Sequence, residues 1–170
     1  MFRTTSKNHY TLNTMVDRKA NIMISVNAII LSLIIGALVG GNMVLERQDI
    51  APTVLMALTC TLSIIYAVFA IRPEKTHGEF TETEIREKKG NLLFFGNFHN
   101  MHFRDFEWGM LQMLSDRNFL YSTMIRDLYY LGQTLNRKYV FIRRSLNIFI
   151  LGFALTAAVT IAIRVFQSLS

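Results

Sequence analysis

Three long uncharged runs constrain this sequence more than any other feature. Residues 22–45, 50–71 and 145–163 contain 24, 22 and 19 residues without one Lys, Arg, Asp or Glu, and charged residues flank each run. A bilayer core of about 30 Å is crossed by about 20 apolar residues that rise 1.5 Å each. A charged side chain in the middle of such a helix costs about 3 kcal/mol or more in lipid. All three runs therefore predict transmembrane helices.

The chain is expected to be an all-α integral membrane protein with three transmembrane helices. The predicted segments are an amphipathic cytosolic helix at 1–21, spans at 22–45, 50–71 and 145–163, an external turn at 46–49, a small and mostly helical cytosolic region at 72–144, and an external tail at 164–170. The cytosolic region has 73 residues, near the lower limit for a domain that folds unaided. A sizeable enzyme domain is not expected, and no catalytic residue is assigned.

The basic residues predict the orientation in the membrane. Sixteen of the 18 Lys and Arg residues lie in residues 1–21 and 72–144, and only Arg47 and Arg164 lie in the other polar segments. Basic residues favour the cytoplasmic side, so the N-terminus is expected in the cytoplasm and the C-terminus in the periplasm or outside. The net charge of +6 is explained by this topology and by attraction to anionic lipid, without a nucleic acid partner.

The region between the second and third runs contains signals for three helices. Thr81 and Glu84 fit a capping box, which predicts a helix over 82–89. An apolar face predicts a second helix over 103–114, and Ser115 or Asp116 is suited to cap a third helix. In that third helix apolar residues recur at three- and four-residue spacing, a pattern called the seam below: Tyr121, Met124, Leu128, Leu131, Leu135, Ile142 and Phe149.

The seam predicts packing against another helix, in the same chain or in a neighbouring one. Lys138 interrupts it, and Tyr139 is expected to take that place. Because no proline follows, the third helix is expected to continue into the last span as one rod of up to about 50 residues, with Gly132 as its weakest point.

Polar and small residues inside the first span are candidates for association or for a pore. Ser32, Gly36 and Gly40 recur every four residues, a spacing that lets helices approach closely in lipid. This face packs either against a second copy, giving a homo-oligomer, or against the other spans of its own chain. Asn27 lies about one and a half turns into the span. It is expected either to line a polar gate or to tie two helices together.

An aromatic stretch at residues 94–108 contains the candidate ligand site. It combines six Phe or Trp side chains with amides, imidazoles and one guanidinium, and the residues assigned to a site are Phe95, Asn97, His99 and Arg104, with Arg126 from the following helix. Aromatic faces stack nucleobases and Arg suits a phosphodiester, so the stretch fits a small anionic nucleotide. The alternative is that these aromatics form the core of a small domain.

The His and Asp residues of this stretch also raise the question of a metal. His99, His102 and Asp105 are three residues apart, and these residue types bind metals. No further Cys or His supports such a site, and a paired His-Asp hydrolase signature is missing. No metal and no cofactor are expected.

Several stretches resemble the Pycsar transmembrane effector family. The likeness begins at residues 17–30, DRKANIMISVNAII, and continues at Phe95-Gly96-Asn97-Phe98. It returns at residues 127–132, DLYYLG, with Leu135 and Lys138-Tyr139. The order and spacing of these stretches match the family across nearly the whole chain.

This resemblance implies an antiphage effector of the bacterial inner membrane. In the family, a partner uridylate or cytidylate cyclase makes a cyclic pyrimidine mononucleotide, cUMP or cCMP, on phage infection. The effector senses this nucleotide and impairs the membrane, which causes abortive infection. The resemblance favours a nucleotide pocket over a plain aromatic core. The alternative function is a non-signalling scaffold or accessory subunit of a larger membrane complex.

Overall fold

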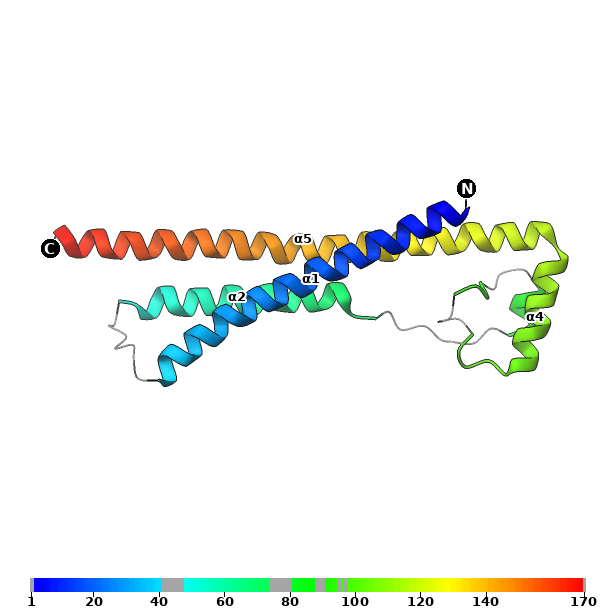
Figure 1. Cartoon of the computed structure of the whole chain (residues 1–170), viewed down its shortest axis with the longest axis horizontal. Coiled ribbons are helices and arrows are strands. Elements are labelled where there is room, and N and C mark those ends of the chain that lie inside the picture. Colours follow the sequence, from blue (N-terminus) through cyan, green and yellow to red (C-terminus); the bar gives the residue numbers. More distant parts are fainter. Residues whose placement is uncertain are drawn as a thin grey trace. The chain divides into compact units, whose positions relative to one another are not determined.

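The computed structural model of the protein describes residues 2–40, 48–73, 81–87, 91–94, 96 and 98–169, apart from the side chain of Glu82. Within these residues every regular element is a helix: α1 (Phe2–Val39), α2 (Ile50–Ile71), α3 (Glu82–Arg86), α4 (Phe103–Ser115) and α5 (Arg117–Leu169) (Figure 1). The predicted all-helical class is therefore confirmed for the described part of the chain.

Three of these helices are long and apolar enough to cross a membrane: α1, α2 and α5. They contain the three uncharged runs, although α1 ends at Val39 and residues 41–45 of the first run lie outside the described residues. The chain is accordingly a membrane protein with three candidate spans, as the sequence predicts.

The chain divides into two compact units, which are described separately. The head unit comprises Met1–Leu12 and Pro73–Leu135, and the span unit comprises Asn13–Arg72 and Asn136–Ser170. Helices α1 and α5 each contribute residues to both units.

The head unit is built around a small apolar core. Ile85 of α3, Leu92 of the following loop, Met113 of α4 and Phe119 of α5 are all buried. Gly109 allows the close approach of these segments, because a Cβ placed there would lie 2.8 Å from Leu92 Cδ1 and 3.0 Å from Ile85 Cδ1. The core therefore joins α3, α4 and the start of α5.

The predicted caps of α3 and α5 are present. Thr81 and Glu84 form the capping box, and α3 is described over Glu82–Arg86 while residues 88 and 89 of the predicted helix lie outside the described part. Asp116 Oδ1 accepts hydrogen bonds from the backbone N–H groups of Asn118 at 2.9 Å and Phe119 at 3.2 Å, so Asp116 caps α5. The capping box follows from the sequence, and of the two predicted candidates for the cap of α5, Ser115 and Asp116, the structure uses Asp116.

The third predicted helix is continuous. α5 runs for 53 residues and passes through Gly132 without a break. The ring of His9 on α1 lies 3.7 Å from a Cβ built at Gly132, which is ordinary contact. The prediction of one long rod is confirmed.

The seam faces the protein for most of its length. Of the predicted seam residues only Tyr121 is exposed, and it stacks on Phe2 with ring centroids 6.3 Å apart. The sequence predicts that Tyr139 takes the place of Lys138 in the seam, and this prediction is wrong. Lys138 is itself turned inward, whereas Tyr139 is exposed. Lys138 can occupy a seam position because Asp17 on α1 neutralises its charge.

Candidate functional site

A buried polar node joins the three span helices. Asn27 of α1, Ser63 of α2 and Ser145 of α5 are each 0% exposed. Asn27 Nδ2 donates to Ser63 Oγ at 3.1 Å, and Ser145 Oγ donates to the Ser63 carbonyl oxygen at 2.8 Å. The two serine hydroxyls lie 3.0 Å apart. In this structure Asn27 therefore ties helices together, the second of its two predicted alternatives.

The Asn27 amide is only half satisfied. Its Nδ2 also donates to the Met23 carbonyl oxygen at 2.7 Å, whereas its buried Oδ1 has no hydrogen-bond partner among the described residues. A buried acceptor without a donor costs free energy, which offsets part of what the node contributes.

An ion pair joins α1 and α5 within the span unit. Lys138 Nζ lies 2.8 Å from Asp17 Oδ1, and the side chains are 16% and 36% exposed, respectively. The pair is thus partly withdrawn from water but still reached by it. The sequence pattern marked Lys138 as an interruption, but it contained nothing that identified Asp17 as its partner.

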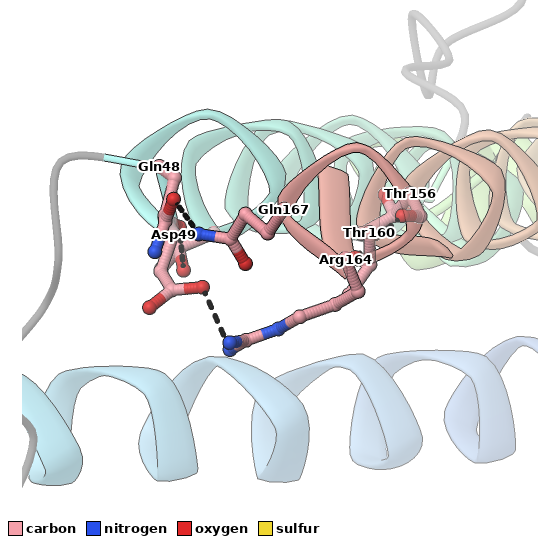
Figure 2. Close-up of polar contacts among 7 residues, drawn as sticks. Gln48, Asp49, Thr156, Thr160, Arg164 and Gln167 are labelled. Carbon is pink, nitrogen blue, oxygen red and sulfur yellow. Dashed lines mark hydrogen bonds and ion pairs between the residues drawn. The ribbon is translucent and has the colours of Figure 1, made fainter. Parts of the chain in front are cut away.

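A second set of polar contacts joins the beginning of α2 to the end of α5. Figure 2 shows Arg164 directed toward Asp49 and Gln167 toward Gln48. Arg164 Nη2 lies 3.2 Å from Asp49 Oδ1, and Arg164 is 60% exposed. An ion pair in water contributes at most about 1 kcal/mol. These contacts align the two helices but do not dominate the stability of the span unit.

A close contact between small residues also joins α2 and α5. A Cβ added at Gly152 would overlap the hydroxyl and methyl groups of Thr59 and would lie 2.8 Å from its Cβ. Close approach of this kind is a main source of helix association in lipid. The face of α5 around Gly152 is thus used for packing inside the chain.

Among the described residues, none packs closely against the predicted association face of the first span at Gly36. Ser32, Gly36 and Gly40 are exposed, and a Cβ added at Gly36 would meet nothing within 4 Å. Of the two alternatives for this face, packing against the other spans of the same chain is not what the structure shows.

A shallow apolar groove runs between α2 and α5 in the span unit. Its volume is about 390 Å³, and it is lined by Met56, Phe153, Thr156, Ala157, Thr160 and Ile161. The hydroxyl of Thr156 donates to the Gly152 carbonyl oxygen and that of Thr160 to the Thr156 carbonyl oxygen, both at 2.8 Å. Because both hydroxyls are satisfied within their own helix, the groove offers a nucleotide no polar anchor.

The five predicted ligand residues all belong to the head unit by sequence, but they are unevenly described. Phe95 and Asn97 lie outside the described residues. The Nδ1 atom of His99 lies 3.2 Å from the Gly96 carbonyl oxygen, Arg104 is exposed in the first turn of α4, and Arg126 is half-buried on α5. Among the described contacts none joins His99 to Arg104.

Part of the aromatic stretch packs as a core. The rings of Phe98 and Phe106 have centroids 4.6 Å apart, and the guanidinium of Arg86 lies 5.2 Å from the centre of the Trp108 ring. These two contacts agree with the core alternative for the residues concerned. Phe103 differs, since it is 73% exposed.

The loop before the aromatic stretch is held to α5 by an amide. The buried Asn91 donates through Nδ2 to Asp127 Oδ1 at 3.4 Å, and its Oδ1 accepts from the Leu93 N–H at 3.1 Å. The sequence analysis did not single out Asn91. An isolated asparagine in a turn gives no signal of a contact with a residue 36 positions away.

No metal site is formed by the described residues. Within them no group of three or more His, Cys, Asp or Glu side chains lies close enough to hold an ion. His102 instead precedes α4 as its N-cap, without a side-chain capping bond.

The comparisons with known proteins identify the family. No curated protein and no solved structure matches the chain. The family model described as the Pycsar effector protein domain matches residues 1–164, and this range includes both the head unit and nearly all of the span unit. This family is one of signal-responsive effectors and is not a known enzyme family. The chain therefore belongs to the Pycsar effector family, which makes it an antiphage defence effector whose signal is a cyclic nucleotide from a partner cyclase.

Proposed function

We propose that this effector senses a cyclic pyrimidine mononucleotide, cUMP or cCMP, and then impairs the bacterial inner membrane. The head unit lies in the cytoplasm in this proposal, together with the N-terminus, and the C-terminus lies on the periplasmic side. The infected cell loses membrane integrity before phage can spread. No cofactor takes part, and the nucleotide acts as a signal.

The family match over residues 1–164 is the observation that carries this proposal. The architecture agrees with it, because a small head unit with a polar, aromatic loop region is covalently continuous with three candidate spans. The basic residues support this orientation. Lys and Arg are more numerous in residues 1–21 and 72–144 than in residues 46–49 and 164–170 at the opposite ends of the spans.

The nucleotide is proposed to bind in the head unit near Phe95, Asn97, His99, Arg104 and Arg126. A pyrimidine ring stacks on an aromatic face for about 1–3 kcal/mol, and a guanidinium forms a charge-assisted hydrogen bond with the cyclic phosphate. Arg104 is suited to the second role because it is exposed and no described carboxylate pairs with it.

Helix α5 is proposed to carry the signal into the membrane. It is one continuous helix that contributes to both units. A ligand that shifts a 1:99 equilibrium to 99:1 must favour the active state by about 5.5 kcal/mol. One stacked base and one phosphate contact approach this value, and several protomers that switch together reduce the free energy required of each.

The membrane is proposed to be impaired by a homo-oligomer that forms through Ser32, Gly36 and Gly40. This face is exposed on α1 and free of intrachain contacts at Gly36. Gly36→Leu is expected to reduce self-association without changing the fold of the monomer. Crosslinking in membranes measures this effect, and an unchanged oligomer would remove the face from the mechanism.

Binding of the nucleotide tests the proposed function directly. Calorimetry with detergent-purified full-length protein compares cUMP, cCMP and, as a control, cyclic AMP. Micromolar or tighter binding of one pyrimidine nucleotide alone is the expected result. If folded protein binds neither, the function is wrong and the scaffold or accessory-subunit alternative takes its place.

A substitution at Arg104 tests the ligand site. Arg104→Ala is expected to abolish the toxicity caused by co-expressed cyclase while the protein still accumulates in the membrane. Arg3→Ala is the matched control, because Arg3 is an exposed arginine of the head unit outside the proposed site. Loss of accumulation with Arg104→Ala would instead make Arg104 a structural residue.

A further inference from the structure

The ion pair between Asp17 and Lys138 occupies a place where packing alone favours an apolar residue. Position 138 continues the three- and four-residue spacing of the seam between Leu135 and Ile142, both of which are buried. The two side chains are 16% and 36% exposed, and an ion pair that water still reaches contributes at most about 1 kcal/mol. Stability therefore does not explain why a lysine stands there.

Among the contacts described above between α1 and α5, the Asp17–Lys138 pair is the one formed by two charged side chains that water still reaches. Lys138 Nζ and Asp17 Oδ1 are 2.8 Å apart, and Asp17 is 36% exposed. A polar contact further along α5 is different, because Ser145 is completely buried and its partner Ser63 is uncharged and buried as well. Of these two contacts, only the ion pair can exchange its partner for water at little cost.

The position of the pair along both helices adds a second argument. α1 passes from the head unit into the span unit at Asn13, and α5 does so at Asn136. Asp17 and Lys138 therefore stand four residues beyond the first passage and two beyond the second. A change that travels along either helix from the head unit meets this pair before it meets the node formed by Asn27, Ser63 and Ser145.

We infer that the Asp17–Lys138 ion pair is an autoinhibitory latch that holds α1 against α5 in the resting effector and opens on activation. This inference rests on the proposed function and names the contact that regulates it. While the latch is closed, the charge of Lys138 is neutralised inside the seam. When it opens, both charges hydrate and α5 is free to change its packing against α1.

Removing one charge from the latch tests this inference in cells that lack the cyclase. Asp17→Asn and Lys138→Gln keep the size of each side chain and remove its charge. Each is expected to raise uptake of a membrane-impermeant dye by roughly two- to fivefold over wild type at equal protein level, since losing a partly exposed ion pair shifts a two-state equilibrium by about that factor. The charge swap, Asp17→Lys with Lys138→Asp, is expected to restore the resting level.

Asp49→Asn is the matched control, because it breaks the Asp49–Arg164 pair of the same unit, away from the passages between the units. Its dye uptake is expected to equal that of wild type. The latch is wrong if both single variants accumulate and stay at the wild-type level, or if the charge swap fails to reverse their effect. It is also wrong if neither single variant accumulates, because the pair is then a folding contact.

Dye uptake by the wild type with and without the cyclase distinguishes a failure of the latch from a failure of the proposed function. If wild type responds to the cyclase and the single variants are silent without it, the latch fails and the function stands. If the single variants permeabilise cells and wild type ignores the cyclase, the latch stands and the assigned signal is wrong.

Discussion

The head unit and the span unit bury different kinds of side chain. The buried residues of the head unit are mostly bulky and apolar: Ile85, Leu92, Met113 and Phe119. Those of the span unit are mostly small or polar: Ala20, Asn27, Thr59, Cys60, Ser63, Ala67, Ala70 and Ser145. One chain therefore uses two ways of holding helices together.

The solvent explains the difference. In water, burying apolar surface drives association at about 25 cal/mol per Å², so the head unit gains from every large side chain that it encloses. In lipid that gain vanishes, because the acyl chains are as apolar as leucine, and close packing with hydrogen bonds takes its place. Many large apolar residues of the span unit accordingly point outward, as Leu33, Leu58 and Leu151 do.

The largest loss of unfolding free energy is expected from a substitution in the core of the head unit. Leu92→Ala removes a side chain that is 1% exposed and should cost about 2–5 kcal/mol of unfolding free energy. Trp108, the only tryptophan, lies in α4 and reports the transition by fluorescence in the full-length protein. Leu111→Ala on the exposed face of the same helix is the control. A loss below about 1 kcal/mol for Leu92→Ala would show that the stability of the head unit does not depend mainly on this apolar core.

An intermediate effect is expected at Gly152, where the span unit depends on close approach. Gly152→Ala forces α2 and α5 apart at Thr59 and should cost about 1–3 kcal/mol. Gly109→Ala in the head unit should cost less, because the atoms in its way are the mobile ends of Leu92 and Ile85 and alanine favours the helix.

Unfolding in mixed detergents, followed by circular dichroism, compares these two variants. Combining Gly152→Ala with Thr59→Ala should recover part of the loss, because the overlapping hydroxyl and methyl groups are removed. A cost at Gly109 equal to that at Gly152 would contradict the proposed difference between the units.

The smallest effect is expected from the polar node. Asn27→Leu should cost about 0.6 kcal/mol, and no more than about 1.7 kcal/mol, the range for hydrogen bonds between helices in lipid. The cost is small because Asn27 Oδ1 has no described partner and the bonds between Ser63 and Ser145 remain. The same unfolding measurement applies, with Asn21→Leu at an exposed position of the same helix as its control. A much larger loss would make the node a principal support of the bundle.

Much of the secondary structure was predictable from local signals. The capping box at Thr81, the cap at Asp116 and the continuous α5 all follow from residues within a few positions of one another. The candidate site was less predictable. His99 and Arg104 were chosen for their chemistry, and no described contact brings them together. Chemistry that suits a ligand does not by itself specify which side chains converge.

The amino-acid sequence by itself determined the helices, the three candidate spans and the family, because apolar length, periodicity and caps are local properties of the chain. Only the tertiary structure decided the partners of Lys138 and Ser145 on α5. Lys138 meets Asp17 across 121 positions, and Ser145 meets Ser63 across 82. Such pairs depend on how each helix is rotated and where helices cross, and many distant contacts together set these quantities.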